Sequence, residues 1–165
     1  MPFTPFHFGP HSCVALALQK HIDLPVFVLA NVIVDLEPLT VMLLNLKYPV
    51  HGYCHTFLIG SILAIVWALI AYNLKGIFGY LMKTVGLSDK TSFAKMVFSG
   101  VLGIWLHVLF DAPLYRDIRP FYPFESNPLY GILSSQIVYG ICAVSFVPAL
   151  ILYIITVLTF SRRKR

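Results

Sequence analysis

The chain has 165 residues, of which 58% are hydrophobic and only 12% are charged, and its mean hydropathy is +0.81. A soluble domain of this length keeps about a quarter of its residues charged. The composition therefore argues against soluble enzymes, nucleic-acid-binding proteins and disordered adaptors alike. We expect an integral membrane protein, and we interpret the net charge of +5 as a matter of topology.

The first third of the chain contains two short apolar runs. The N-terminus has no basic stretch and so does not resemble a cleaved signal peptide. Residues 9–18 and 24–34 are each shorter than the roughly 20 residues that span a bilayer as a helix, and we expect them to form a tucked antiparallel pair. A proline inside a helix loses a hydrogen bond and clashes with the preceding turn. Pro38 is therefore expected to end the second helix or to begin a new one, leaving 39–46 as a short interfacial segment.

Later runs are long enough to cross a membrane. Residues 56–74 carry no charge, and residues 129–160 are interrupted only by Pro148. The uncharged run 96–110 would rise only about 22 Å as a helix, so it needs its flanks or neighbouring helices to cross. The sequence thus predicts an all-α membrane bundle of four to five helices that forms a single domain over residues 1–165.

Charged residues sort onto two sides if these segments alternate up and down. One side carries Lys20, Lys75, Lys83, Lys90, Lys95, Arg162, Arg163, Lys164 and Arg165. The other side carries Lys47, Arg116, Arg119, five histidines (His7, His11, His51, His55, His107) and five acids (Asp35, Glu37, Asp111, Asp117, Glu125). The positive-inside rule places the first side, with the C-terminus, in the cytoplasm. The histidine-rich side would then face outward from a membrane such as the bacterial inner membrane.

The spacing of these histidines and acids indicates a metal site. His51 and His55, like His107 and Asp111, are four residues apart, which on a helix places two side chains on one face. Asp35 and Glu37 add carboxylates just before Pro38. Histidine, aspartate and glutamate are ligands of zinc and other divalent metals. One such pair alone is more often a hydrogen-bonded core histidine, but several pairs expected at the same membrane edge favour a metal.

The order of these motifs resembles a known family. The motifs are Phe6-His7-Phe-Gly-Pro, Asp35-Leu-Glu37-Pro38, His51-Gly-Tyr-Cys-His55-Thr56, His107-Val-Leu-Phe-Asp111 and Asp117-Ile-Arg119-Pro120-Phe121. Their order is similar to that in the LexA-regulated, membrane-bound metal-dependent hydrolases. That family is similar in ligand pattern to the superfamily of zinc-dependent phospholipases C and P1-type nucleases.

The resemblance implies phosphoester hydrolysis and five metal ligands: His7, Asp35, His55, His107 and Asp111. His51 stands where the family has arginine, so its assignment as a sixth ligand rests on its spacing from His55. Glu37-Pro38 replaces the more usual Asp-His of the family, which leaves the number of metal ions open.

Further residues have candidate roles in such a reaction. Glu37 or Asp117 could accept a proton from water, and Glu37 is favoured because it lies two residues from a presumed ligand. Arg119 could bind a phosphate bidentately, or could anchor the chain at the membrane interface. His11 is either an additional ligand or a polar residue of the N-terminal segment.

Three classes of function remain open on the sequence. The first is a metal-dependent phosphoesterase acting on a lipid or a lipid-linked substrate, since the site is expected at a membrane edge. The second is a transporter of divalent metals or protons, and the third is a non-catalytic membrane protein with a structural metal. The polar groups gather at one side only, which argues against a conduction path.

Overall fold

The computed structural model describes residues 5–87 and 90–162, and this part of the chain is entirely helical and irregular. The elements are η1 (Pro5–His7), α1 (Phe8–Ala17), α2 (Leu24–Leu43), η2 (Tyr53–His55), α3 (Phe57–Asn73), α4 (Lys75–Thr84), α5 (Phe93–Asp111), α6 (Ser135–Val144) and α7 (Phe146–Arg162). The predicted all-α class is confirmed.

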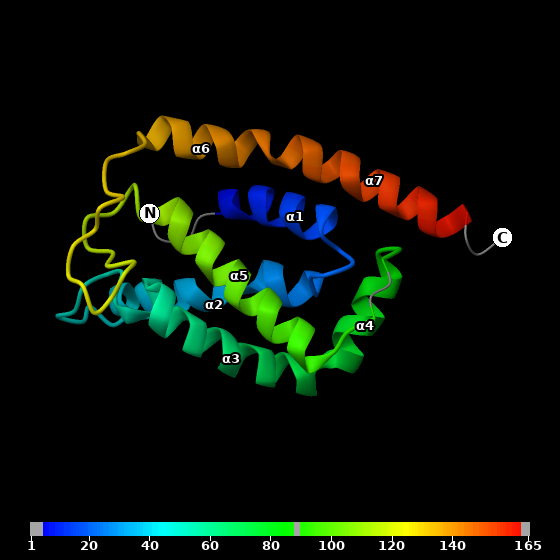
Figure 1. Cartoon of the computed structure of the whole chain (residues 1–165), viewed down its shortest axis with the longest axis horizontal. Coiled ribbons are helices and arrows are strands. Elements are labelled where there is room, and N and C mark those ends of the chain that lie inside the picture. Colours follow the sequence, from blue (N-terminus) through cyan, green and yellow to red (C-terminus); the bar gives the residue numbers. More distant parts are fainter. Residues whose placement is uncertain (1–4, 88–89, 163–165) are drawn as a thin grey trace.

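Three helical segments are long and apolar enough to cross a membrane. They are α2, α5 and the stretch Ser135–Thr159, in which α6 and α7 follow one another. A fourth span arises if α3 and α4, which are bent by 75° at their junction, are counted as one. The expected integral membrane protein is therefore supported, although the sequence did not indicate that α4 is a separate helix turned away from α3 (Figure 1).

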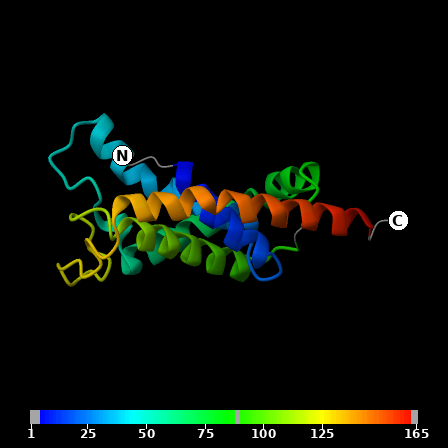
Figure 2. The same ribbon diagram turned by 90° about the horizontal axis from the view of Figure 1, so that it is seen from above.

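The helices form an elongated bundle whose long axis they largely share (Figures 1 and 2). Helices α2, α3 and α5 pack against one another, and α1 runs antiparallel to α2, as expected from the two short runs. Helices α6 and α7 lie along α1 on the outside, and most of their span is exposed. The loops 44–56 and 112–134 gather at one end of the bundle.

Side-chain caps set the starts of several helices. Asp23 accepts a hydrogen bond from the backbone N–H of Val26 at the start of α2, and Thr56 accepts one from Ile59 at the start of α3. Ser92 and Ser134 cap α5 and α6 in the same way. Each cap satisfies one of the N–H groups that a helix leaves free at its N-terminus.

The prediction that Pro38 interrupts the chain is wrong. Pro38 lies inside α2, so the expected segment 24–34 and residues 39–43 of the expected segment 39–46 belong to one helix that ends at Leu43. A proline at this position removes a hydrogen bond to the carbonyl of Val34. Val34 and Val41, on either side of it, are both buried, and this packing offsets the lost bond.

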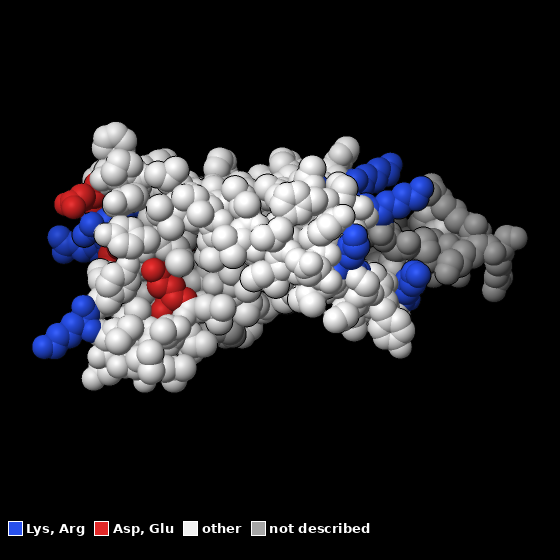
Figure 3. Space-filling view, turned by 90° about the horizontal axis from the view of Figure 1, so that it is seen from below, with Lys and Arg blue, Asp and Glu red and all other residues white. Residues whose placement is uncertain are grey.

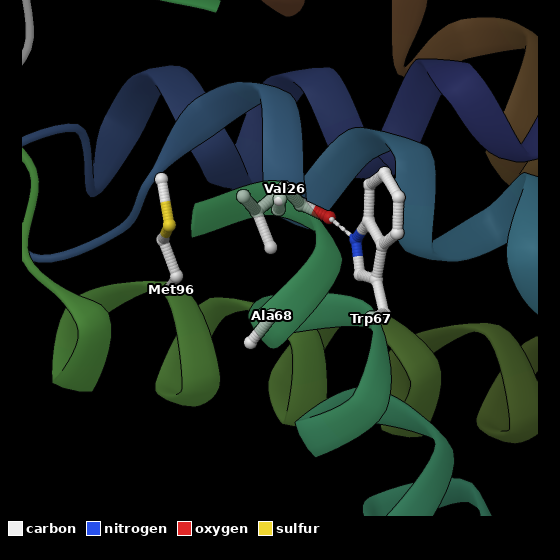
Figure 4. Close-up of a cluster of buried hydrophobic side chains, with 5 residues drawn as sticks. Val26, Trp67, Ala68 and Met96 are labelled. Atoms are coloured by element: carbon white, nitrogen blue, oxygen red, sulfur yellow. Dashed lines mark hydrogen bonds between the residues drawn. The ribbon is translucent and has the colours of Figure 1, made fainter. Parts of the chain in front are cut away.

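The end of the bundle opposite the loops is closed by an apolar cluster. Val26, Trp67, Ala68 and Met96 bring α2, α3 and α5 together there, as Figure 4 shows. The indole N–H of Trp67 donates to the carbonyl of Val26 at 3.1 Å, which satisfies the one polar atom of that side chain.

Charge separates along the bundle. On the face shown in Figure 3, acidic side chains appear only at the end that carries the loops, whereas basic side chains appear at both ends. Lys20 and Lys90 lie in the connections at the opposite end, Lys75 and Lys83 lie in α4, and Lys95 lies at the start of α5. Arg163, Lys164 and Arg165 lie outside the described residues. The middle of that face is uncharged, as a membrane-embedded surface requires.

Small residues allow the central helices to approach closely. A Cβ atom on Gly103 of α5 would lie 2.6 Å from the carbonyl oxygen of Phe27 and 2.7 Å from the Cβ of Ala30, both on α2. A Cβ on Gly60 of α3 would lie 2.7 Å from the side chain of Ile104. Such contacts between small residues are a common basis of helix packing in membranes.

We predict that Gly103→Ala separates α2 from α5 and destabilises the protein by about 1–3 kcal/mol, the usual cost of overpacking. Thermal unfolding of the detergent-solubilised protein would measure this as a lower Tm. Gly140→Ala in α6 is the matched control, because no atom lies within 4 Å of its added Cβ. An equal Tm for both variants would contradict the close helix contact.

Candidate metal centre

Four buried side chains converge at the loop end of the bundle. Asp35 comes from α2, His55 from η2, and His107 and Asp111 from the last turn of α5. Each offers one ligand atom, and these atoms all lie within 4.8 Å of one another. His107 Nε2 is 3.3 Å from Asp35 Oδ1 and 3.2 Å from Asp111 Oδ2, and His55 Nε2 is 3.7 Å from Asp35 Oδ1. The expected convergence of these four residues is confirmed.

The ligand atoms lack hydrogen-bond partners. Among the described residues, the buried side-chain atoms without a partner are His7 Nε2, Asp35 Oδ1, His51 Nε2, His55 Nε2, His107 Nε2 and Asp111 Oδ1. A buried polar atom left unpaired costs about 1–3 kcal/mol, and more where it is charged. All six atoms belong to predicted metal ligands, and a divalent cation is the partner that would satisfy nitrogen lone pairs and carboxylate oxygens together. The residues present therefore fit a metal.

Contacts at the other ring nitrogen, Nδ1, orient two of the histidines so that Nε2 faces the centre. The Nδ1 atom of His107 lies 2.9 Å from Asn31 Oδ1, and the Nδ1 atom of His55 lies 3.4 Å from Glu37 Oε2. An acceptor at Nδ1 places the proton there, which leaves the lone pair on Nε2 for a metal. Metal-binding histidines in proteins commonly have such a partner.

Glu37 also shapes the loop that carries His51 and His55. Its Oε2 accepts hydrogen bonds from the backbone N–H groups of Gly52 at 3.1 Å and Cys54 at 3.0 Å. The prediction that His51 and His55 share a helix face is wrong, since only 53–55 forms a short 3-10 helix. Their rings nevertheless lie 4.9 Å apart, because the carboxylate of Glu37 folds the loop instead.

His51 lies beside this group and is held by Asp117. Asp117 accepts hydrogen bonds from the backbone N–H of His51 at 2.9 Å and from its Nδ1 at 3.1 Å. Burial lowers the pKa of His51, so the ring is neutral and its Nε2 can act as a ligand. Burial alone would raise the pKa of Asp117, but the hydrogen bonds from the backbone and ring N–H groups of His51 lower it overall.

His7 approaches the centre from the N-terminal side. It is buried in η1, and its Nε2 lies 3.3 Å from Asp111 Oδ1 while its Nδ1 lies 3.4 Å from Nδ1 of His107. Burial, followed by the nearby His107, lowers the pKa of His7 to about 4, so its imidazole is neutral at physiological pH. His7 and His51 thus flank the four convergent residues on opposite sides.

His11 is not part of the centre. Both of its ring nitrogens face backbone carbonyls, with Nδ1 at 2.9 Å from His7 O and Nε2 at 3.0 Å from Gly103 O. The hypothesis that His11 is an additional metal ligand is therefore wrong. His11 instead joins α1 to α5 at the point where Gly103 brings the backbone close.

Two neighbours of the centre were not identified from the sequence. Asn31 lies four residues before Asp35 on α2, and this spacing on an otherwise apolar helix was a usable signal. Tyr115 lies in the loop after α5, and its ring packs against that of His51 with centroids 4.2 Å apart. No spacing rule connects Tyr115 to His51, so this contact had no signal in the sequence.

A pocket of about 170 Å³ lies beside the centre at the loop end. Its lining includes His51, Asp117, Tyr48 and Arg119, and the four convergent residues lie behind it. The guanidinium of Arg119 lies 3.4 Å from the exposed carboxylate of Glu125, so this side chain is at the mouth of the pocket.

Fold and site together define an all-α protein with membrane-length helices and a buried His/Asp group that could hold a metal. No protein family, curated protein or solved structure matches the chain. The family resemblance of the motifs accordingly stays a prediction.

We predict that purified protein retains a divalent metal and that Asp111→Ala abolishes this binding. Asn31→Ala should weaken metal affinity by about 10–100-fold, as is typical for the loss of a partner that orients a histidine ligand. Competition with a chelator, followed by elemental analysis, would measure both effects. Asn73→Ala is the matched control, since Asn73 is exposed and bonds only to the carbonyl of Leu69 in its own helix. If wild type and Asp111→Ala contain equal metal, the proposed ligand set is refuted.

Proposed function

We propose that this protein is a membrane-embedded, metal-dependent hydrolase that cleaves a phosphoester of a lipid or lipid-linked substrate at the membrane edge. One observation carries the proposal. The buried, unpartnered atoms of Asp35, His55, His107 and Asp111 converge beside a pocket that opens at the loop end of the bundle.

The ligand set suits zinc best among the divalent metals, because imidazole nitrogens and carboxylate oxygens are its usual protein ligands. Such an ion, when bound, makes water a stronger acid and polarises a phosphoryl oxygen. Asp35, His55, His107 and Asp111 would hold it, with His7 and His51 next to them. In the hydrolysis, the water oxygen bonds to phosphorus, the ester P–O bond breaks, and the departing alcohol oxygen takes up a proton.

Asp117 is the better candidate to accept the proton of the attacking water. It lines the pocket, and its side chain is 37% exposed. Glu37 was the favoured base on the sequence, but its side chain is only 14% exposed and does not line this pocket. Its Oε2 accepts from Gly52, Cys54 and His55. We assign Glu37 as a positioning residue for His55. Arg119, at the pocket mouth, is placed to bind a phosphate by exchanging its contact with Glu125.

An apolar layer beneath the centre disfavours transport. Ala30, Val34, Ala64, Ile104 and Val108 are fully buried together, and they come from the three central helices α2, α3 and α5. An ion leaving the centre toward the basic end would cross this layer without polar contacts, at a cost of several kcal/mol.

A purely structural metal is also disfavoured. A structural site is usually closed by four ligands, whereas His7 Nε2 and His51 Nε2 are two further unpartnered nitrogens beside this group. The pocket lined by His51 gives a substrate a way to approach this side of the group.

We predict that the metal-loaded protein hydrolyses phosphomonoesters or phosphodiesters between about pH 5 and 9, and that Asp111→Ala removes both metal and turnover. Asp117→Asn should retain metal and lose about a hundredfold in kcat, as expected for loss of a general base. Steady-state kinetics with metal analysis of each variant would test this.

Glu37→Gln distinguishes the two carboxylates. If Glu37 positions His55, Glu37→Gln should bind metal more weakly, and its kcat should be restored when metal is added in excess. A kcat that stays about a hundredfold low in fully metal-loaded Glu37→Gln would show that Glu37 is the base instead. Failure of the intact, metal-loaded protein to cleave any phosphoester would refute the hydrolase proposal.

We also propose that the centre faces outward and the basic end faces the cytoplasm. Five lysines of the described residues, Lys20, Lys75, Lys83, Lys90 and Lys95, lie at the end opposite the loops, and the positive-inside rule orients such an end inward. In a variant whose Cys13, Cys54 and Cys142 are replaced by serine, a membrane-impermeant thiol reagent applied to intact cells should label Glu125→Cys and leave Lys90→Cys unlabelled. The reverse pattern would invert the orientation.

A further inference from the structure

A groove of about 500 Å³ runs along the outer surface of α2 and α3. Its apolar walls are formed by Ile33, Leu36 and Val41 of α2, by Leu63 of α3 and by Leu46 just after α2. Its volume lies within the range of about 300–1,000 Å³ that is usual for ligand sites. Because α2 is a candidate membrane span, this groove opens toward hydrocarbon.

The groove reaches a neighbour of the metal centre. Its lining includes Glu37, Cys54 and Tyr48, and Glu37 contacts the ring of the proposed metal ligand His55. Tyr48 also lines the pocket of about 170 Å³ that contains His51 and Asp117. Tyr48 is therefore a wall residue of both the apolar groove and the polar pocket.

The position of Tyr48 depends on Gly52. A Cβ atom on Gly52 would lie 2.3 Å from Cε1 of Tyr48 and 2.5 Å from Oε1 of Glu37. One edge of the tyrosine ring thus lies against Gly52 of the metal-binding loop, where a larger residue would displace it. Tyr48 is 39% exposed, so its ring is not enclosed by the core.

We infer that the substrate is a long-chain phosphoester whose hydrocarbon chain lies in the α2–α3 groove while its phosphoryl group enters the pocket beside His51, passing over Tyr48. This inference rests on the proposed hydrolase function and specifies its substrate class. An amphiphile in this position keeps its chain at membrane depth and presents only its head to the loop end. The chain supplies binding energy by apolar burial, and Arg119 and Asp117 meet the polar head.

Two alkyl phosphates with the same head group test the inference. The metal-loaded wild-type protein in lipid nanodiscs should hydrolyse hexadecyl phosphate with a higher kcat/KM than butyl phosphate, with inorganic phosphate release as the measurement. Thr40→Trp places an indole in the groove at an exposed position of α2. It should lower the ratio of the two kcat/KM values by about tenfold or more, the effect expected when a hydrophobic site loses room for part of its ligand.

Ile151→Trp is the matched control, because Ile151 is 52% exposed on α7, away from the groove. Its ratio should equal that of the wild type. Equal kcat/KM for both esters in the wild type, or an equal fall of the ratio in Thr40→Trp and Ile151→Trp, would overturn the groove as the chain site and leave the hydrolase function standing.

A photoreactive hexadecyl phosphate with a diazirine in its chain gives a readout that does not require turnover. Labelling should concentrate on peptides of α2 and α3 and fall in Thr40→Trp, while labelling of α7 stays unchanged. Labelling spread evenly over α7, α2 and α3 would indicate ordinary membrane lipid and refute the inference. Concentrated labelling without hydrolysis of either ester would refute the substrate assignment and leave a lipid-binding groove. The hydrolase function itself would be refuted only if no phosphoester were cleaved.

Discussion

The physical constraint on this structure is that six potential metal-ligand atoms are buried without a hydrogen-bond partner among the described residues. These atoms belong to four histidines and two aspartates, and they lie where α2, α5, η1 and the loop 44–56 meet. Apolar side chains at the same positions would be buried without the desolvation free energy that a polar group loses. Here the carboxylates of Asp35 and Asp111 are buried together, with their ligand atoms within 4.8 Å of one another, an arrangement that is strongly unfavourable without a cation. The free energy of metal binding would therefore also stabilise the junction of these elements.

Packing of the rest of the bundle keeps the elements of this junction close together. His107 Nε2 lies 3.3 Å from Asp35 Oδ1, and these atoms belong to two different helices. That distance requires α2 and α5 to be nearly in contact, which Gly103 allows one turn before His107. On the other side of the centre, Glu37 and Asp117 each hold a histidine by its Nδ1 and also bind backbone N–H groups of the loop. Two carboxylates thus fix ligand orientation and loop shape at once.

The sequence predicted those parts of the site that depend on local geometry. His107 and Asp111 share a helix face because they are four residues apart on a regular helix, and Asp35 follows from its place near the end of an apolar run. His51 and His55 have the same spacing but lie in a loop, whose path is set by hydrogen bonds to Glu37, 15 and 17 residues away. The prediction for Pro38 was wrong because the rule that proline ends or begins a helix considers only the local backbone, whereas burial of the surrounding residues keeps α2 continuous. Contacts that close over long sequence separations, such as Tyr115 against His51, have no local signal.

Access to the centre is determined by the loops rather than by the spans. The chain after α5 is tied back to the bundle by the N–H of Phe57, which donates to the carbonyl of Pro120 at 2.9 Å, and by Asn127, whose amide donates to the carbonyls of Ala112 and Tyr115. These bonds keep Asp117 against His51 and Arg119 at the pocket mouth. The apolar layer of α2, α3 and α5 closes the opposite direction. Among the described residues, openings next to the centre include the pocket at the loop end and the groove along α2 and α3. A molecule with a charged head and an apolar chain would use both openings at once, with its head in the pocket and its chain in the groove.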